Sequence, residues 1–284
     1  MYFFFRWIID LIGRLSSPGR VTLWTHHLNS RHLKRRVRID VYRPPGLPWT
    51  PYPLALFNDG QDLPRMDAAA ELERAFSAGD LPPLLVVGLH AGDRMREYGT
   101  SGRPDYQGRG DLAHAYERFV TEEVLPFLHR RYRVSHDTER RALAGFSLGG
   151  LSAFDIVFRN PKAFHVAGVF SGALWWRSLA FNPADPDADR ILHDTVLQLG
   201  HRPGLRAWFM AGTEDEEADR NNNGVIDAID DTLHLIDHLR HNGHVDPNDV
   251  AYLEVPGGRH EPETWGRVFI PFLRWAFPPQ SGRT

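Results

Sequence analysis

Residues 141–150 read RALAGFSLGG. The first four form a short apolar run that favours a buried strand, and residues 148–159 have the spacing of an amphipathic helix. Between them lies the pattern Gly-x-Ser-x-Gly, which is typical of a sharp turn from a strand into a helix. The serine at its tip must adopt a strained backbone, and the flanking glycines lack Cβ atoms that would clash there. Ser147 is therefore a candidate nucleophile.

A serine nucleophile needs a base and an orienting carboxylate, and the chain supplies candidates for both downstream. In α/β-hydrolases the order is Ser, then Asp or Glu, then His, each on a loop after a strand. Residues 206–211 indicate a buried strand followed by Glu214 and Asp215, and residues 250–255 indicate a strand followed by a Gly-Gly turn and His260. We predict that Asp215 is the acid and His260 the base. Glu214 is the alternative acid.

The negative charge that develops on an attacked ester needs two backbone N–H donors. One comes from the residue after the nucleophile, which is Leu148. The other comes from a loop after an earlier strand, and residues 54–57 indicate such a strand, followed by the turn NDGQD at residues 58–62. We predict Gln61 as the second donor, with Asp62 as the alternative.

Taken in order along the chain, these motifs resemble the putative esterase family of α/β-hydrolases. That family includes enterochelin-esterase-like, esterase D-like and feruloyl-esterase-like proteins and bacterial mycolyltransferases. The resemblance extends from about residue 21 to residue 277. The segments that carry it are 58–62 (NDGQD), Arg94, 97–98 (EY), Tyr116, Phe119, Glu123, Pro126, 144–150 (AGFSLGG), 160–161 (NP), Phe164, 170–173 (FSGA), 175–176 (WW), 211–215 (AGTED), 257–260 (GGRH) and Trp265. It implies an α/β-hydrolase fold, with a mainly parallel central sheet and helices on both faces.

The resemblance also implies a substrate pocket and its rim. It places Trp175 and Trp176 in or against the pocket wall. It places Arg94, Glu97 and Tyr98 near the rim of the active site. Adjacent tryptophans are also typical of core packing, and an Arg with a Glu three residues later is typical of a surface ion pair, so these alternatives stay open. The chain departs from the family at Asn58, where members often have His.

The composition indicates one compact domain over residues 21–284. A net charge of −3 gives no electrostatic reason to expect nucleic-acid binding. The basic cluster at residues 31–38 alternates with apolar residues, which is typical of a solvated strand face. With no cysteine, the chain has no disulfide, thiolate metal site or cysteine nucleophile.

Residues 1–20 are rich in aromatic side chains. Arg6, Asp10 and Arg14 interrupt the apolar run and no small-residue cleavage site follows, which fits neither a signal peptide nor a membrane span. We predict a helix or extension that docks on the body of the protein. Contact with a membrane surface or a second subunit is the less favoured alternative. The predicted location is cytoplasmic, and no oligomeric state is predicted.

From residue 54 onward, strands and helices alternate, which favours a mainly parallel sheet covered on both faces. The helical stretches include residues 112–131. Residues 178–200 interrupt the alternation after the predicted sixth strand. We predict that this insertion forms a lid over the site.

Residues 219–230 read DRNNNGVIDAID and match the twelve-residue calcium-binding loop. The predicted ligands are Asp219, Asn221, Asn223, the carbonyl of Val225, Asp227 and Asp230. Asp230 replaces the usual, longer Glu, so the choice between Ca²⁺ and Mg²⁺ stays open. A single loop favours a structural ion over a sensor. The alternative is a polar turn that caps a helix over residues 232–242.

The predicted function is hydrolysis of a carboxylic ester through an acyl-enzyme on Ser147, without a catalytic cofactor. The expected substrate is a small-molecule or acylated-carbohydrate ester. Two alternatives stay open: an acyltransferase with the same residues, and a non-catalytic, calcium-stabilised binding domain that has kept the fold.

Overall fold

The computed structural model describes residues 20–46, 50–241 and 245–278. The predicted N-terminal helix or extension therefore lies outside the described residues, apart from Arg20. The described residues form an eight-stranded sheet. Its strands are β1 (Thr22–Asn29), β2 (Arg36–Arg43), β3 (Leu54–Asn58), β4 (Leu85–Leu89), β5 (Arg141–Phe146), β6 (Val166–Phe170), β7 (Arg206–Glu214) and β8 (Val250–Arg259).

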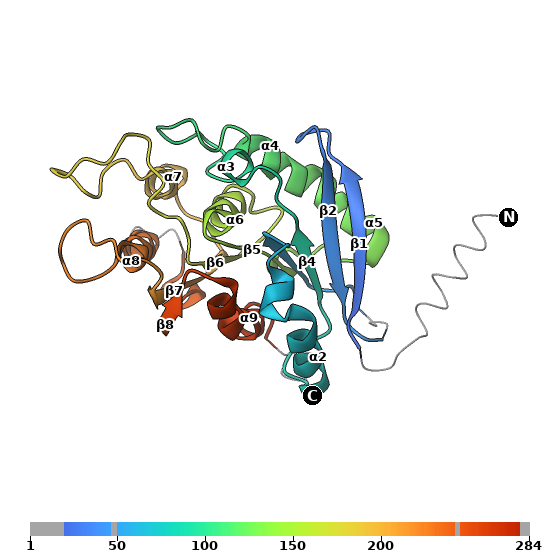
Figure 1. Ribbon diagram of the computed structural model, residues 1–284. Helices are drawn as coiled ribbons and strands as arrows, with labels where there is room; N and C mark the ends of the chain where they lie inside the picture. The colour runs from blue at the N-terminus through green and yellow to red at the C-terminus, as the bar shows by residue number, and fades with distance from the viewer. Residues whose placement is uncertain (1–19, 47–49, 242–244, 279–284) are drawn as a thin grey trace.

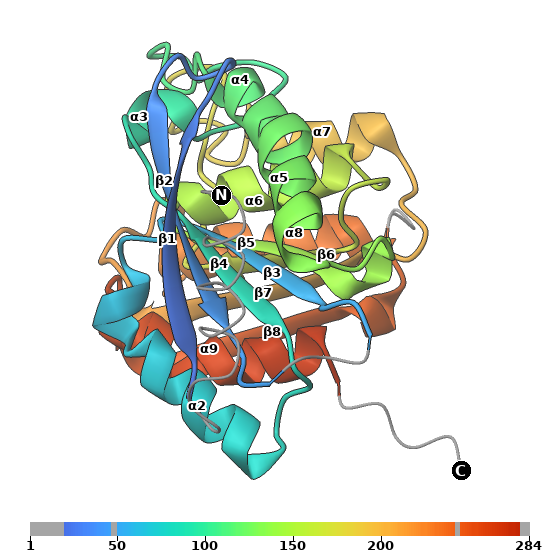
Figure 2. The same cartoon turned by 90° about the vertical axis from the view of Figure 1, so that its right-hand side faces the viewer.

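The strands lie in the order β1-β2-β4-β3-β5-β6-β7-β8. β2 pairs antiparallel with β1 and β4, and the other pairs are parallel. Strands β3, β4, β5 and β6 are buried along their whole length, as is typical of parallel strands covered on both faces. Figure 2 shows the strong twist of the sheet between β1 and β8. The predicted α/β architecture is thereby confirmed.

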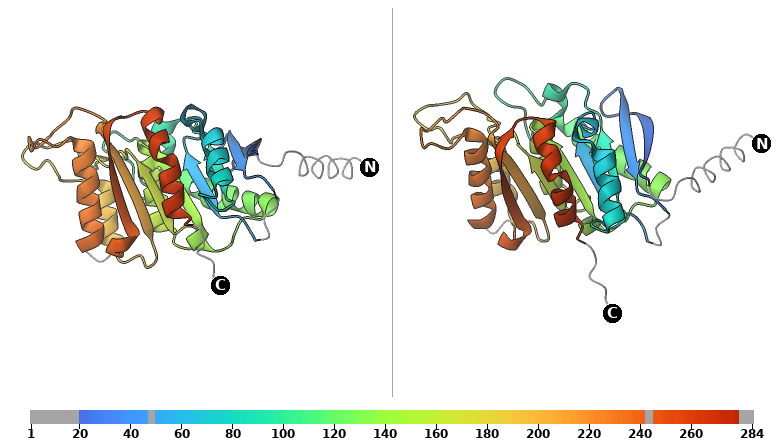
Figure 3. Two further views of the ribbon diagram at one scale, coloured as in Figure 1. Left: turned by 90° about the horizontal axis from the view of Figure 1, so that it is seen from below. Right: turned by 60° about the horizontal axis from the view of Figure 1, so that its bottom comes forward.

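Helices cover both faces of the sheet (Figure 1). They are η1 (Leu63–Met66), α2 (Ala68–Ala78), α3 (Arg94–Glu97), α4 (Ala113–Arg118), η2 (Phe119–Val124), α5 (Leu125–Tyr132), η3 (Thr138–Arg140), α6 (Leu148–Arg159), α7 (Ile191–Leu199), α8 (Asp227–His241), η4 (Pro247–Asp249) and α9 (Pro262–Ala276). One core lies between the sheet and α4 to α8, and a second lies under η1, α2 and α9. Figure 3 shows α2 in cyan and α9 in red side by side on the second face. Alternation along β3 feeds both cores, because Leu54 and Leu56 enter the first and Phe57 the second.

Two helical predictions need correction in detail. The stretch predicted over residues 112–131 is one run made of α4, η2 and α5, and η2 is a π-helical segment. Pro126 cannot donate to a carbonyl one turn earlier, which explains the local widening. The helix predicted as amphipathic, α6, is buried at every residue from Leu148 to Phe158 because α3, α7 and the sheet surround it.

The predicted insertion over residues 178–200 lies between β6 and β7, and its second half forms α7. Arg190 is buried and donates to Asp231 of α8 at 2.7 Å. Arg220, from the loop before α8, lies 2.8 Å from the same carboxylate. These buried ion pairs tie the insertion to α8. Its role as a lid stays a prediction.

None of the helices within the described ranges is long and apolar enough to cross a membrane. The helices α8 and α9 have 15 residues each, and a span needs about 20. The cytoplasmic location stays a prediction.

Candidate active site

Ser147 forms the turn between β5 and α6. Its backbone angles are φ 55° and ψ −122°, a region that residues with a Cβ atom rarely adopt. Its N–H donates to the carbonyl of Phe170 at 2.9 Å, and its carbonyl accepts from Ala173 at 3.1 Å. The end of β6 and the loop after it therefore hold the strained turn. The Ser147 hydroxyl makes no hydrogen bond with His260 or with any other described residue.

Gly149 brings the first turn of α6 against the loop after β3. A Cβ atom on Gly149 would lie 2.5 Å from Oδ2 of Asp59 and 3.1 Å from Cβ of Asn58. The first of these distances is far shorter than a van der Waals contact. A residue larger than glycine would therefore push apart the two segments that carry the predicted oxyanion donors.

Residues 58–62, which we call the oxyanion loop, contain an unpaired N–H group. Gly60 and Asp62 donate to backbone carbonyls at 2.9 Å, whereas the N–H of Gln61 has no acceptor within the described ranges. The N–H of Leu148 is also without an acceptor there, because it is the first residue of α6. Of the two candidates in the loop, Gln61 rather than Asp62 thus has a donor to offer.

Asn58 is completely buried and binds the oxyanion loop to two helices. Its Nδ2 donates to the carbonyl of Gly149 at 2.8 Å, and its Oδ1 accepts from the hydroxyl of Tyr116 at 2.7 Å. A side-chain amide supplies one donor side and one acceptor side. Asn58 uses both, so the departure from the family's His has a clear structural role.

Asp59 and Arg94 form a two-bond ion pair in the same loop. Arg94 donates from Nε to Oδ1 at 2.7 Å and from Nη2 to Oδ2 at 2.9 Å. Asp59 is buried and has φ 58°, and its N–H donates to the hydroxyl of Tyr98 at 3.0 Å. Although burial works against the charged form of Arg94, the bond to Asp59 raises the pKa of Arg94 above its ordinary value. Arg94 thus contacts the loop directly.

Glu97 and Tyr98 are both buried, and their expected place near the active-site rim stays a prediction. Glu97 is buried and receives two hydrogen bonds of 2.6 Å from Arg35, from the turn before β2. Tyr98 is fully buried, and burial followed by the charge of Asp59 raises the pKa of Tyr98 well above its ordinary value. The spacing of residues 94–97 suggests a local ion pair, whereas each charged residue pairs with a distant partner.

Asp215 and His260 follow the neighbouring parallel strands β7 and β8. The Asp215 side chain is buried, and its Oδ2 accepts from the N–H of Gly212 at 3.0 Å. Its Oδ1 has no hydrogen-bond partner and lies 4.0 Å from Nδ1 of His260. Catalytic hydrogen bonds are often long before a substrate binds. The chain thus brings a buried, half-satisfied carboxylate to the predicted base.

Glu214, the alternative acid, lies at the surface and pairs with Arg259. Its side chain is 55% exposed and accepts from Nε of Arg259 at 3.2 Å. The pairing of β7 with β8 shifts register between Gly212 and Glu214. Such an irregularity changes the direction of side chains at a strand end. Here the side chain of Asp215, the next residue, is buried.

The surroundings of His260 favour a neutral imidazole. Burial lowers the pKa of His260 below its ordinary value, the Asp215 carboxylate opposes that effect, and the charge of Arg94 adds to it. The ring of Trp265 meets the imidazole edge-on at a centroid distance of 5.5 Å. A neutral imidazole is the form that can accept a proton from a nucleophile.

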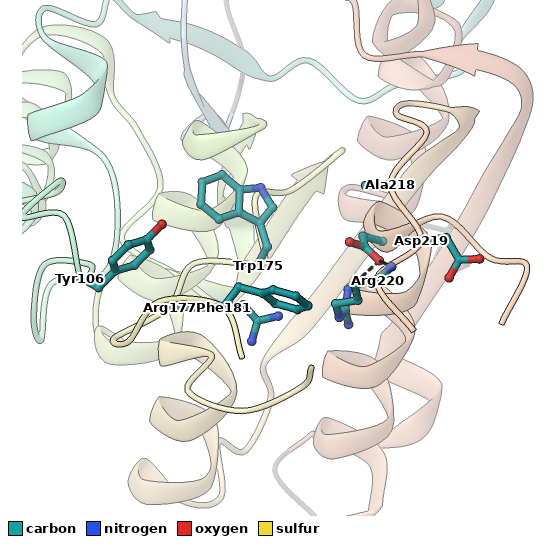
Figure 4. A pocket seen from close by; sticks show the side chains of 8 residues that line it. Tyr106, Trp175, Arg177, Phe181, Ala218, Asp219 and Arg220 are labelled. Atoms are coloured by element: carbon teal, nitrogen blue, oxygen red, sulfur yellow. Dashed lines mark hydrogen bonds and ion pairs between the residues drawn. The ribbon is translucent and has the colours of Figure 1, made fainter. Parts of the chain in front are cut away.

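A cavity of about 340 Å³ lies between the loops after β6 and β7 (Figure 4). Its lining residues are Tyr106, Trp175, Arg177, Phe181, Ala218, Asp219, Arg220 and Asp227. The ring of Trp175 is 37% exposed there. Trp176 is fully buried and belongs to the core, which agrees with the alternative of core packing. The loops that line the cavity also carry Asp215 and hold the turn at Ser147.

The predicted metal loop folds back on itself. Asp219 accepts from the N–H groups of Asn223 and Gly224 at 3.1 and 2.9 Å, and the amides of Asn221 and Asn223 both donate to Asp230 at 2.9 Å. Helix α8 begins at residue 227, earlier than predicted, so the last predicted ligands lie in its first turn.

The remaining predicted ligand side chain, Asp227, has a partner within the protein. Asp227 accepts from the N–H of Arg220 at 2.9 Å and lies 3.1 Å from its guanidinium. Within the described ranges, no group of three or more His, Cys, Asp and Glu side chains could hold a metal ion. Metal binding by this loop stays a prediction.

The family model described as putative esterase matches residues 30–276. The chain belongs to this family. It is 23% identical over 259 residues to the uncharacterized protein YbbA of Bacillus subtilis (strain 168), over 87% of this chain and 95% of the relative. It is 25% identical over 227 residues to the iron(III) enterobactin esterase of Dickeya dadantii (strain 3937), over 78% of this chain and 47% of that protein. Family membership supports the prediction of a carboxylic ester hydrolase.

Solved structures share the fold. The enterochelin esterase of Shigella flexneri matches with a TM-score of 0.73 at 20% identity, over 93% of this chain and 60% of that chain. A ferulic acid esterase matches with a TM-score of 0.68 at 19% identity, over 92% of this chain and 99% of that chain. The chain thus spans about half of the Dickeya relative's length and 60% of the Shigella structure.

Sequence reasoning misses several residues around the site. In the sequence Asp59 is only part of a turn signal, although its positive φ and buried carboxylate organise the oxyanion loop. An Asp in an Asn-Asp-Gly turn is a residue type that tolerates this conformation, so a signal for it exists. Tyr106 and Phe181 line the cavity, but no local pattern distinguishes them from other exposed aromatic residues.

Proposed function

We propose that this esterase hydrolyses carboxylic esters through an acyl-enzyme formed on Ser147. The observation that carries the proposal is the backbone of Ser147, with φ 55° between a buried strand and a buried helix. Strained residues persist only where the surrounding structure imposes them, and they cluster at active sites. The unpaired N–H groups of Leu148 and Gln61 support the same role.

The proposed reaction moves one proton in each half. Oγ of Ser147 attacks the ester carbonyl carbon while Nε2 of His260 takes the hydroxyl proton. The N–H groups of Leu148 and Gln61 stabilise the oxyanion, and Asp215 stabilises the imidazolium. The alcohol leaves with that proton. Water then attacks the acyl group in the same way, and Ser147 recovers its proton from His260.

Replacement of the nucleophile tests this proposal. Ser147→Ala should lower kcat for p-nitrophenyl acetate by about 10⁶-fold, as when a triad nucleophile is removed elsewhere. A fluorophosphonate probe should label the unmodified protein and not the variant, and peptide mapping should locate the label at Ser147. The exposed Ser77 on α2 provides the control, because Ser77→Ala should change neither readout. Undiminished turnover by folded Ser147→Ala would refute the mechanism.

Acyl transfer is the alternative that uses the same residues. An alcohol acceptor would then replace water in the second half-reaction. Product analysis with a series of added alcohols separates the two activities, because a transferase forms new esters in preference to the free acid. A non-catalytic binding domain would show neither product nor probe labelling.

We further propose that the ester carries a ring next to its reacting group. The aromatic side chains of Tyr106, Trp175 and Phe181 on the cavity wall support this, since such surfaces stack on planar groups. The relatives named enterobactin esterase and ferulic acid esterase agree with a ring-bearing substrate. Two arginines line the cavity, but both have partners within the protein. Arg177 donates to a backbone carbonyl, and Arg220 pairs with carboxylates. The cavity therefore does not require a negatively charged ring.

Matched substrates test the ring. Trp175→Ala should lower kcat/KM for methyl cinnamate or phenyl acetate and leave methyl butyrate unaffected. Leu197→Ala removes a comparably exposed apolar side chain from α7 outside the cavity and should affect no substrate. An equal loss for all three esters in Trp175→Ala would contradict a ring-binding role.

We also propose that residues 219–230 bind a structural Ca²⁺ ion. The spacing of oxygen-bearing residues and the closed loop around Asp219 and Asp230 support it. A native-state ligand at a hundredfold excess over Kd stabilises by about 2.7 kcal/mol, which is several degrees in Tm. Ca²⁺ should raise Tm, EGTA should reverse the rise, and Asp230→Ala should abolish the response while Asp237→Ala keeps it. If neither Ca²⁺ nor Mg²⁺ changes Tm, the loop is a polar turn without a metal ion.

A further inference from the structure

We propose that Arg94 is a positioning residue for the oxyanion loop rather than a substrate-binding residue. Its guanidinium fixes Asp59, and through Asp59 it aims the N–H of Gln61 at the reacting carbonyl oxygen. The inference rests on the proposed serine-esterase function. It assigns to Arg94 a role that acts through a neighbouring loop, without contact with the substrate.

The geometry of the ion pair is suited to fixing a loop. Both donors of the guanidinium fork meet both oxygens of Asp59, at 2.7 and 2.9 Å. Two parallel charge-assisted bonds define the orientation of a carboxylate as well as its position. The Asp59 side chain is fully buried, and Arg94 is the cation paired with it. Gln61 adds a third bond, from Nε2 to Oδ1 at 2.8 Å.

The backbone of the loop depends on the side chain that Arg94 holds. Asp59 has φ 58°, which is unfavourable for a residue with a Cβ atom and must be imposed by its contacts. Its carbonyl accepts from the N–H of Asp62 at 2.9 Å, which closes the turn around Gln61. The peptide that presents the Gln61 N–H is therefore anchored on both sides, and Asp59 is the anchor on one of them.

Arg94 also lies against the nucleophile's strand. Its Nη2 lies 3.5 Å from the carbonyl of Phe146, the residue before Ser147. Oδ2 of Asp59, the oxygen that this same nitrogen contacts, occupies the space that a side chain on Gly149 would need. One guanidinium thus sits where the oxyanion loop, the end of β5 and the start of α6 meet.

The charge of Arg94 provides a second, separable effect. The charged groups near Arg94 are Asp59 and Asp62, with the buried hydroxyl of Tyr98, and those that act on His260 are Asp215 and Arg94. Arg94 lowers the pKa of His260 in addition to the lowering by burial. Arg94→Lys keeps the positive charge but loses the two-bond geometry, whereas Arg94→Gln loses both. The two variants should therefore differ in the pH dependence of kcat/KM.

Two variants separate geometry from charge. Arg94→Gln should lower kcat for p-nitrophenyl acetate by about 10²–10³-fold, the loss typical of one misplaced oxyanion donor, with KM unchanged. It should also move the acidic limb of the kcat/KM profile to higher pH. Arg94→Lys keeps the charge without the planar fork, so kcat should fall while the limb stays in place. Asp59→Asn should reproduce the loss of kcat.

Arg96 gives a matched control on the same helix. It forms an equally forked pair with Asp111, with Nε to Oδ1 at 3.0 Å, but that pair is on the surface. Arg96→Gln should change neither kcat nor the pH limb. If Arg94→Gln fails to fold, Arg94→Lys and Asp59→Asn still carry the test.

A substrate-binding role predicts a different pattern. In that case Arg94→Gln would raise KM for an anionic ester such as monomethyl succinate and leave kcat for the neutral ester intact, and this result would overturn the proposal. Unchanged kcat in both Arg94→Lys and Asp59→Asn would also overturn it. If the unmodified protein shows no Ser147-dependent turnover, the proposed function fails instead, so the two failures are distinguishable.

Discussion

The folded state of Ser147→Gly should be more stable than that of Ser147→Ala, although both changes remove the proposed nucleophile. The backbone at this position has φ 55° and ψ −122°. A non-glycine residue held in such a region costs about 1–3 kcal/mol. Glycine adopts positive φ without that cost, but it loses about 0.5–1 kcal/mol more conformational freedom on folding than alanine does. The net gain over Ser147→Ala should therefore be about 1 kcal/mol.

The comparison with Ser147→Ala isolates the backbone effect. Both changes remove the hydroxyl and abolish the proposed reaction, but alanine keeps the Cβ atom and its strain. Thermal unfolding followed by circular dichroism should place the Tm of Ser147→Gly a few degrees above that of Ser147→Ala, at about 2–4 °C per kcal/mol. Urea unfolding should show the same order at constant m-value. A glycine variant less stable than the alanine variant would refute the reasoning, because the strain at this turn would then be smaller than the entropy cost of glycine.

Four further predictions concern the site and its supports. The acidic limb of kcat/KM should lie below pH 6.5, because burial lowers the pKa of His260 and catalysis needs its neutral form; a limb above pH 7 would contradict this. The same shift makes the unfolded chain bind the proton more readily, so stability measured by urea unfolding should fall as the pH drops below about 6.5. Gly149→Ala should displace Asp59 and lower kcat by about 10²-fold in steady-state assays, and an unchanged kcat would mean that the loop tolerates the side chain. Asp231→Leu should cost about 3–5 kcal/mol in urea unfolding because it removes the buried carboxylate that Arg190 and Arg220 share, whereas Asp80→Ala at a surface pair should cost less than about 1 kcal/mol.

The parts of the site that could be predicted from the sequence are those encoded locally. A strand, a tight turn and a helix around Ser147 follow from residues close together in the chain. The positions of Asp215 and His260, each directly after a strand, follow from the alternation of strands with helices. In each case a short pattern and its position were enough, because parallel strands end at the same edge of the sheet.

The parts that could not be predicted depend on distant partners. Arg94 pairs with Asp59, and Glu97 pairs with Arg35, although residues 94 and 97 are spaced for a pair with each other. Burial of α6 on all sides is also hidden in the sequence, since Asp155 suggests a solvated face. In the structure Asp155 is buried and bound by Arg159 and by the N–H of Ser101. Spacing alone does not reveal which polar residues find partners inside.

The position of β8 at the edge of the sheet links the proposed chemistry to the order of synthesis. β8 pairs only with β7 in the described sheet, and it is made after every other strand. A domain generally folds as a unit, so it cannot complete its sheet before its last strand has been made. The turn at Ser147 and the loop at Gln61 belong to earlier strands, but His260 joins them only when β8 docks. A growing chain should thus remain inert toward esters, and turnover during synthesis should first appear after β8 has left the ribosome.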